Sequence, residues 1–413
     1  MRGGLIGRGV AVLACAAAVV ATASGARPRT QVLAHVYPGG GYSGDVYAQD
    51  GYAYLSSWHG TECPSLGVRV YDVHNPSRPR RVATFADGGS DLSVRGSWTE
   101  KTIVQHVVTT SFKGELAVTS FQQCPATNAF RGFGLYDVTS PARPRLLSLV
   151  RTEPGGSHEI WLQQVGRKAY VYTAIPLAEW GHPPSAEEPG FRIYDVSDPR
   201  RPVRLSGWIA PASMRVGKKL VFVHSVRVNP SGTRAFLSYW DLGTVILDIS
   251  NPRKPRYLGR TNDTQGAAHS TALSADGKLL IETHETTGGR PSLWDISNPR
   301  HPRRLGVFHA PASLLAEARR RTGGNDFTLG VHDPKIVGKR AYFSWYALGV
   351  LVADISNPRH PRFVAQFLPQ GTRDPERGFC PRARCTYTWG VFPERRFVLA
   401  SDLVGGLWVF RLR

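Results

Sequence analysis

Five histidines stand at similar distances before the glycine of a predicted turn. Four of them precede that glycine by eight residues and the last by six, and they are His106, His158, His224, His269 and His332. Imidazoles that converge from separate rigid strands suit Zn, Cu or Fe, and nearby carboxylates would complete or orient the ligand shell. The alternative is that a duplicated unit repeats its residues, each ring binding a backbone carbonyl or water.

Other polar and aromatic side chains are expected close to these histidines, at neighbouring strand ends. The binding candidates are His59, Glu159, Asp241, His284, Asp402 and Trp389, and Asp45 takes the histidine position in the first unit. The sequence contains no HExxH, GxSxG or CxxC motif, each of which has a known catalytic or redox geometry. No catalytic residue is therefore assigned.

The elements that would position these residues come from a repeated phrase, Asp-(Val/Ile)-x-x-Pro-x-x-Pro, which closes an apolar run. Its aspartates are Asp72, Asp137, Asp195, Asp248, Asp295 and Asp354. Self-similarity of this kind indicates a repeat fold. Because the aspartate is used in the same way in every copy, we expect it to accept N–H bonds in its turn.

Each repeat contains four short runs rich in β-branched and aromatic residues, bounded by Gly, Pro, Asn or Asp. After the sixth motif, residues 395–412 supply two more strands of a seventh unit, and residues 31–37 supply its missing outer strand. The sequence therefore predicts an all-β fold, a seven-bladed β-propeller of four-stranded antiparallel blades, closed by the N-terminal strand. Residues 27–413 would form this single domain.

The alternation of turns in antiparallel blades puts the long insertions on the face that carries the histidines. These insertions are 86–102, 121–131, 175–190, 309–327 and 369–384. Within 309–327 the sequence predicts a short helix with Ser313 as its cap and Gly323 as its end. Insertions gathered on one face favour a binding surface there.

The repeats GVRVYDVHNPSRP, GFGLYDVTSPARP, GTVILDISNPRKP and GVLVADISNPRHP resemble the LVIVD repeat family of exported bacterial β-propellers. The similarity extends over essentially the whole chain after its N-terminal segment. It implies a propeller fold and export from the cytoplasm, but it implies no particular activity.

The N-terminal segment 1–26 has the basic, apolar and small-residue regions of a secretory signal. Cys15 leaves open a lipoprotein anchor, but free secretion or a cell-surface location is the prediction that we carry forward, with no transmembrane span in the mature chain. Four cysteines follow the segment. Cys63 and Cys124 occupy equivalent loops of neighbouring repeats, and Cys380 and Cys385 close a small loop, so the sequence predicts two disulfides rather than four free thiols.

The formal net charge of +20 has a partly structural origin, because 16 of the 51 Lys and Arg residues lie in or beside the repeated turns. We expect no nucleic-acid partner and a monomer. The sequence favours a propeller that binds a protein, glycan or anionic envelope polymer through its loop face without catalysis. The alternatives are a metal-dependent oxidoreductase or lyase, and simple electrostatic attachment through the arginine-rich rim.

Overall fold

The computed structural model describes residues 30–60, 63, 65–124, 128–153, 155–176, 190–286, 288–323, 326–374, 376, 378–380 and 384–413. The predicted signal segment 1–26 lies outside these residues, as does most of the insertion 175–190. Among the described residues, no helix has the length and apolar character needed to cross a membrane.

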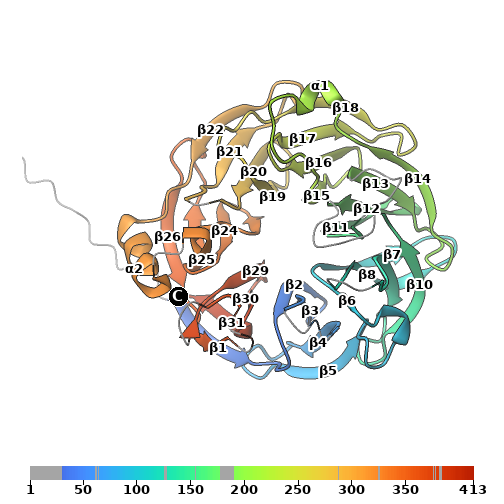
Figure 1. The fold of residues 1–413 in the computed structure, drawn as a ribbon, viewed down its shortest axis with the longest axis horizontal. Coiled ribbons are helices and arrows are strands. Elements are labelled where there is room, and N and C mark those ends of the chain that lie inside the picture. The colour runs from blue at the N-terminus through green and yellow to red at the C-terminus, as the bar shows by residue number, and fades with distance from the viewer. Residues whose placement is uncertain are drawn as a thin grey trace, which may run out of the picture.

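Seven antiparallel sheets stand in a ring around a central axis, which confirms the predicted seven-bladed propeller (Figure 1). Blades 1 to 3 contain β2 (Ser43–Gln49), β3 (Tyr52–Ser57), β4 (Val68–Asp72) and β5 (Arg80–Phe85); β7 (Thr102–Val108), β8 (Lys113–Gln123), β9 (Gly132–Asp137) and β10 (Arg145–Arg151); and β11 (Ile160–Val165), β12 (Lys168–Ile175), β13 (Gly190–Asp195) and β14 (Val203–Trp208). Blades 4 to 6 contain β15 (Ser225–Val228), β16 (Arg234–Tyr239), β17 (Gly243–Asp248) and β18 (Arg256–Arg260); β19 (Ala268–Leu273), β20 (Leu279–His284), β21 (Ser292–Asp295) and β22 (Arg303–Val307); and β23 (Pro334–Val337), β24 (Arg340–Trp345), β25 (Gly349–Asp354) and β26 (Arg362–Phe367).

Blade 7 joins the two ends of the chain. Its strands β29 (Thr388–Pro393), β30 (Val398–Asp402) and β31 (Gly406–Leu412) come from the C-terminal segment. The outer strand is β1 (Thr30–Val36), which pairs antiparallel with β31 from Thr30 opposite Leu412 to Val36 opposite Leu407. The predicted closure by the N-terminal strand is present. It pairs the backbone N–H and C=O groups of β31, which would otherwise form an open sheet edge.

The repeated turns use their aspartates as predicted. Each motif aspartate accepts a hydrogen bond from the backbone N–H two residues later. In five of the six copies an arginine eight residues later also lies within ion-pair distance, as Arg256 does at 2.6 Å from Asp248. Asp195 instead pairs with Lys168 at 3.1 Å. Part of the net positive charge therefore comes from arginines that pair with the motif aspartates of the repeated turns.

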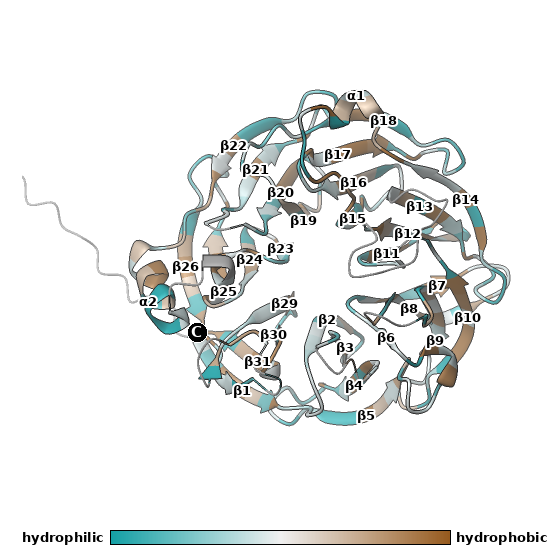
Figure 2. Cartoon of the chain, viewed as in Figure 1, coloured by the Kyte–Doolittle hydropathy of each residue, from teal (hydrophilic) through white to brown (hydrophobic). Residues whose placement is uncertain are grey.

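The hydrophobic core lies between the faces of adjacent blades. Tyr172 and Ile193 of blade 3 pack in one buried cluster with Leu237 and Leu247 of blade 4. Middle strands such as β17 are hydrophobic, and among the outer strands β5 has a hydrophilic stretch whereas β10 is largely hydrophobic (Figure 2). The faces of each blade are therefore buried by its two neighbours in the ring.

The loops between the blade strands carry the remaining described elements, which are η1 (Leu92–Val94), β6 (Ser97–Trp98), α1 (Ala212–Arg215), α2 (Ala312–Thr322), η2 (Asp326–Leu329), β27 (Thr372–Arg373) and β28 (Arg384–Cys385). The predicted helix is α2, and Gly323 ends it with φ 68°. Its cap was predicted wrongly. Pro311 precedes the helix, and Ser313 lies inside its first turn.

Candidate functional site

Four of the five predicted histidines meet at one mouth of the central channel. His158, His224 and His332 directly precede the innermost strands β11, β15 and β23 by one or two residues, and His269 lies in β19. Their rings follow one another around the channel, with centroids 4.3 Å apart for His158 and His224, 3.9 Å for His224 and His269, and 4.3 Å for His269 and His332. The cluster is one-sided, and Trp389 continues it 4.1 Å from His332.

The fifth histidine, His106, is not part of this cluster. It lies near the far end of β7, its side chain is 54% exposed, and its Nδ1 atom lies 2.6 Å from Glu115. Counting from Gly114 failed because the β7–β8 turn spans 109–112, so Gly114 lies inside β8 opposite Val107, whereas Gly166 lies in the turn between β11 and β12. Glu100 occupies the place at the channel mouth that the prediction gave to His106.

Backbone carbonyls fix the orientation of two of the rings. His224 Nδ1 lies 3.1 Å from the carbonyl oxygen of His269, and His269 Nδ1 lies 2.8 Å from that of His332. A carbonyl oxygen only accepts, so each Nδ1 must be the donor and each Nε2 keeps its lone pair. This arrangement is the usual outer-shell support of a metal-binding histidine.

His158 faces His224 across a short gap, with 2.8 Å between the two Nε2 atoms. Its Nδ1 atom lies 2.6 Å from Gln122 Oε1 and 3.2 Å from Glu100 Oε2. Burial lowers the pKa of His158 to about 4 and that of His224 well below its usual range, so both rings are neutral at pH 7.

Carboxylates complete the cluster. Glu285 Oε2 lies 3.5 Å from His269 Nε2, and its other oxygen accepts a hydrogen bond from the Tyr346 hydroxyl. One potential ligand atom from each of His224, His269 and Glu285 lies within 4.8 Å of the other two. Glu100 accepts a 3.2 Å bond from the Trp389 indole, and burial together with Glu159 raises its pKa well above the usual value.

His332 is a further potential ligand. Its side chain is 1% exposed, and in the part of the chain that the structure describes neither ring nitrogen has a hydrogen-bond partner. Burial lowers its pKa well below the ordinary value, so this ring too is neutral. Its Nε2 atom lies 3.8 Å from Glu100 Oε1.

These groups line a cavity of about 340 Å³ that opens on the loop face. Aromatic and apolar side chains, most of them from the loops that follow or join the strands, form the rest of the wall, namely Trp58, Pro176, Leu220, Phe222, Trp240, Phe379, Tyr387 and Trp389. A cavity of this size and composition suits a small molecule or the end of a polymer chain.

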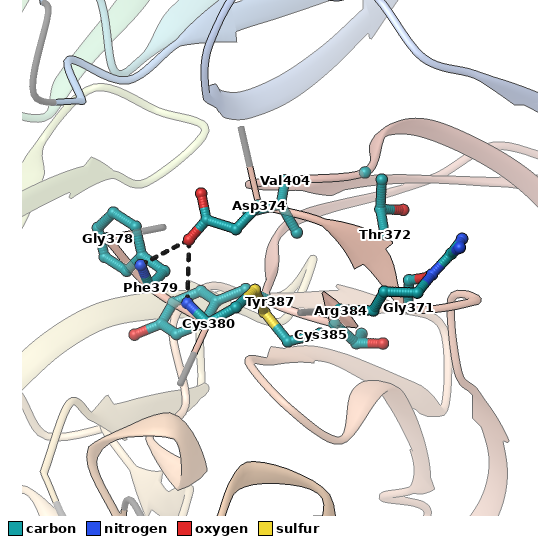
Figure 3. The surroundings of a disulfide bond; sticks show 12 residues. Gly371, Thr372, Asp374, Gly378, Phe379, Cys380, Arg384, Cys385, Tyr387 and Val404 are labelled. Carbon is teal, nitrogen blue, oxygen red and sulfur yellow. Dashed lines mark hydrogen bonds between the residues drawn. A yellow bond between two sulfur atoms is a disulfide. The ribbon is translucent and has the colours of Figure 1, made fainter. Parts of the chain in front are cut away.

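Both predicted disulfides are present, and the one between Cys380 and Cys385 packs with side chains of the cavity wall. Cys63 bonds to Cys124 and so joins the loops of blades 1 and 2, and Cys380 bonds to Cys385. Figure 3 shows the second bond, with Asp374 accepting hydrogen bonds from the backbone N–H groups of Phe379 and Cys380 at 2.8 and 3.0 Å. This short loop holds Phe379 at the cavity wall.

A buried network of charges closes the channel below the histidines. Lys101 Nζ lies 2.5 Å from Asp45, 2.8 Å from Glu159 and 3.1 Å from Asp333. Arg227 contacts Glu159 at 3.2 Å and Asp333 at 3.3 Å, and Lys335 also pairs with Asp333. Three carboxylates thus face three cations, and we call this set of six side chains the channel plug.

Two of the three carboxylates are held in their charged form by the cations of the plug, whereas burial raises the pKa of the third, Asp45. Although burial opposes ionisation, Lys101 and Arg227 lower the pKa of Glu159, and Lys101, Lys335 and Arg227 keep the pKa of Asp333 well below its usual range. Glu159 was predicted as a binding residue beside His158. The structure places it in the plug instead, where its oxygens face cations.

The other predicted binding residues fall into different surroundings. Trp389 lines the cavity. His59 stacks on Trp58 with ring centroids 3.6 Å apart, just outside it. Asp241 accepts the backbone N–H groups of Lys219 and Leu220 and so orders the loop that carries a wall residue.

Asp402 and His284 also lie apart from the cavity. Asp402 is buried and accepts backbone N–H bonds from Tyr387, Val404 and Gly405, and burial raises its pKa to about 6. His284 belongs to a separate buried cluster with Asp263 and Glu282.

Sequence reasoning missed Glu100, Lys101, Gln122, Arg227, Asp333 and Lys335. A signal for Asp333 and Lys101 was present, since Asp333 follows a channel histidine directly, as Glu159 does, and Lys101 follows Glu100 in the same register. Two consecutive ionisable residues at the start of several innermost strands indicate two layers of ionisable groups in the channel.

A family model for the LVIVD repeat matches residues 224–263 and 333–368. Each match begins at the innermost strand and ends at the outer strand of one blade, β15 to β18 in the first case and β23 to β26 in the second. A search of curated proteins found no significant match. The resemblance inferred from the repeated phrase is confirmed, and the chain carries LVIVD repeats.

Proposed function

We propose that this LVIVD-repeat β-propeller is an exported binding protein whose channel-mouth cavity holds a transition-metal ion. His224, His269 and Glu285 would be the ligands, with His158 and His332 at the edge of the coordination sphere. The observation that carries the proposal is the pair of Nδ1–H groups fixed on backbone carbonyls, which leaves the His224 and His269 Nε2 lone pairs available.

Charge and chemistry support a metal of the Zn, Cu or Fe class. Neutral imidazole is a good ligand for these ions, and burial keeps all four rings neutral. The 2.8 Å between His158 Nε2 and His224 Nε2 is a hydrogen-bond distance and is too short for two nitrogen ligands of one tetrahedral ion, so His158 would have to move away for His224 to bind the ion.

The bound ligand would sit on the ion against the aromatic wall. Trp240 is stacked on Phe222 with centroids 5.0 Å apart, and Trp389 packs on His332, so the wall is rigid and flat-faced. Flat aromatic faces suit sugars or other planar groups. We therefore keep a glycan or an envelope-polymer end as the proposed ligand class, in preference to a folded protein surface.

Export is part of the proposal. Two disulfides and the apolar N-terminal segment support an oxidising compartment outside the cytoplasm. Cell fractionation of the full chain, with a version that lacks residues 1–26 as the control, tests this location independently of metal content.

Elemental analysis tests the metal site. The purified chain, stripped with a chelator and reloaded with Zn²⁺, Cu²⁺ or Fe²⁺, is compared with His224→Ala/His269→Ala. We expect the double variant to lose affinity by more than the roughly 10–100-fold that loss of an outer-shell partner causes. His74→Ala/His106→Ala is the matched control, because both side chains are more than half exposed. Equal metal content and affinity in all three proteins would refute the site.

A further inference from the structure

A second group of metal-type ligands meets where blade 4 contacts blade 5, and none of its members lines the channel-mouth cavity. Glu282 and His284 lie two residues apart in β20, and Asp263 lies in the loop between β18 and β19. Their side chains are 0%, 1% and 0% exposed. We propose that these three residues bind a divalent cation of the zinc type that fastens the two blades together.

The spacing of the three groups fits an ion better than direct contact. His284 Nε2 lies 3.5 Å from Asp263 Oδ2 and 3.4 Å from Glu282 Oε1. These separations exceed the usual hydrogen-bond range of about 2.7–3.2 Å. Ligand atoms placed tetrahedrally around an ion at about 2.1 Å lie roughly 3.4 Å apart, which matches both distances.

The surrounding hydrogen bonds aim the ligand atoms at one point. His284 Nδ1 lies 2.8 Å from the carbonyl oxygen of Gly266, so it is the donor there and Nε2 keeps its lone pair. Glu282 Oε2 accepts bonds from the Thr244 backbone N–H at 2.8 Å and the Thr261 hydroxyl at 2.6 Å. Among the described residues, His284 Nε2 and Glu282 Oε1 have no hydrogen-bond partner.

Those same bonds explain why an ion here would link two blades. Thr244 lies in β17 of blade 4, whereas Glu282 and His284 lie in β20 of blade 5. Asp263 is held by the Ser292 hydroxyl of β21 and by the backbone N–H of Gln265 at 3.0 Å. An ion on these ligands would fix the crossing from one blade to the next.

The charge balance favours a divalent ion over a proton. Two buried carboxylates face one imidazole, and the guanidinium of Arg304, which is half exposed, is 4.0 Å from Asp263. A protonated His284 would compensate one negative charge, whereas a divalent ion beside neutral His284 compensates both. The competing arrangement is a protonated His284 that forms ion pairs with the two carboxylates and no metal ion. Burial lowers the pKa of His284, but Asp263 and Glu282 raise it by more, so the pKa lies above its usual value.

The test uses the full mature chain in a His224→Ala/His269→Ala background, so that the channel mouth contributes no ion. The protein is folded with Zn²⁺, dialysed against chelator, and its metal content is measured. We expect about one ion per chain, and less than a tenth of that in Glu282→Gln or Asp263→Asn. Asp276→Asn is the matched control, since Asp276 is an exposed acid in the β19–β20 turn of the same blade.

Melting temperatures keep the proposal testable where a variant does not fold. The His224→Ala/His269→Ala chain folded with Zn²⁺ should melt at least about 3 °C higher than the same chain folded without metal. An absence of bound ion in the background protein, together with a melting temperature that does not respond to Zn²⁺, would overturn the proposal and assign the cluster to an imidazolium ion pair. Neither result bears on the channel-mouth site, which is tested separately by comparing the wild-type chain with His224→Ala/His269→Ala.

Discussion

The Nε2 atoms of His158 and His224 lie 2.8 Å apart, although the two histidines come from neighbouring blades and are 66 residues apart in the chain. The packing of blade 3 against blade 4, through a shared buried cluster, holds the two innermost strands at this separation. The channel mouth is thus a product of neighbouring blades. No single blade contains a site.

The channel plug should contribute strongly to stability through Lys101. Replacing Lys101 with methionine leaves Asp45, Glu159 and Asp333 buried with less compensating charge, so we expect a loss of about 3–5 kcal/mol in the free energy of unfolding. Urea unfolding followed by fluorescence measures it. Lys168→Met removes only a surface ion pair with Asp195 and should cost about 1 kcal/mol or less. Similar losses in both variants would contradict the structural role of the plug.

The motif turns predict a defined acid sensitivity. The pKa values of Asp248, Asp295 and Asp354 are lowered to about 2, by the turn N–H groups and by arginine. Their contribution to stability is therefore complete above the unfolded-state pKa near 4 and is lost as the pH falls toward about 2. Melting temperatures should decline over that interval.

An arginine triple variant tests the cause of this decline. In Arg256→Gln/Arg303→Gln/Arg362→Gln the aspartates lose their ion pairs, so the melting temperature at pH 7 should fall and the further decline toward pH 2 should shrink. The matched control is Arg253→Gln/Arg300→Gln/Arg359→Gln, which removes the same charge from the same turns. These three arginines bind the turn asparagines through their backbone N–H groups, which the substitution keeps. Parallel curves for the two triple variants would refute the ion-pair explanation.

The two disulfides should differ in what they stabilise. Cys63 and Cys124 are 61 residues apart in the chain and Cys380 and Cys385 are five apart, so loop-closure entropy predicts about 4 and about 2 kcal/mol respectively. Serine replacement of each pair, followed by denaturant unfolding, measures both values. The Cys380→Ser/Cys385→Ser variant should additionally weaken metal or ligand binding, because Phe379 loses its anchor. An equal binding defect in both variants would argue against that local role.

The fold could be predicted from the sequence because its information is local and repeated. The Asp-Val and Asp-Ile turns, the alternation of strands and the missing outer strand of blade 7 all follow from short segments. Four of the channel histidines could be located in the same way, by counting from the turn glycine.

The counting fails wherever the length of a hairpin changes. Gly114 lies in β8 and not in the β7–β8 turn, so counting back from it reached His106 inside β7, whereas Glu100 lies at the channel mouth. The partners of Lys101 could not be predicted at all, since Glu159 and Asp333 reach it from blades 3 and 6 only when the ring is closed. Burial of charge in this channel is therefore a tertiary property.

The most direct measurement is anomalous diffraction at the metal absorption edge from crystals of the metal-loaded protein. We predict a peak about 2.0–2.3 Å from the Nε2 atoms of His224 and His269 and close to a Glu285 oxygen. A map without that peak, in which His158 and His224 remain a hydrogen-bonded pair of neutral rings 2.8 Å apart, would contradict the metal site.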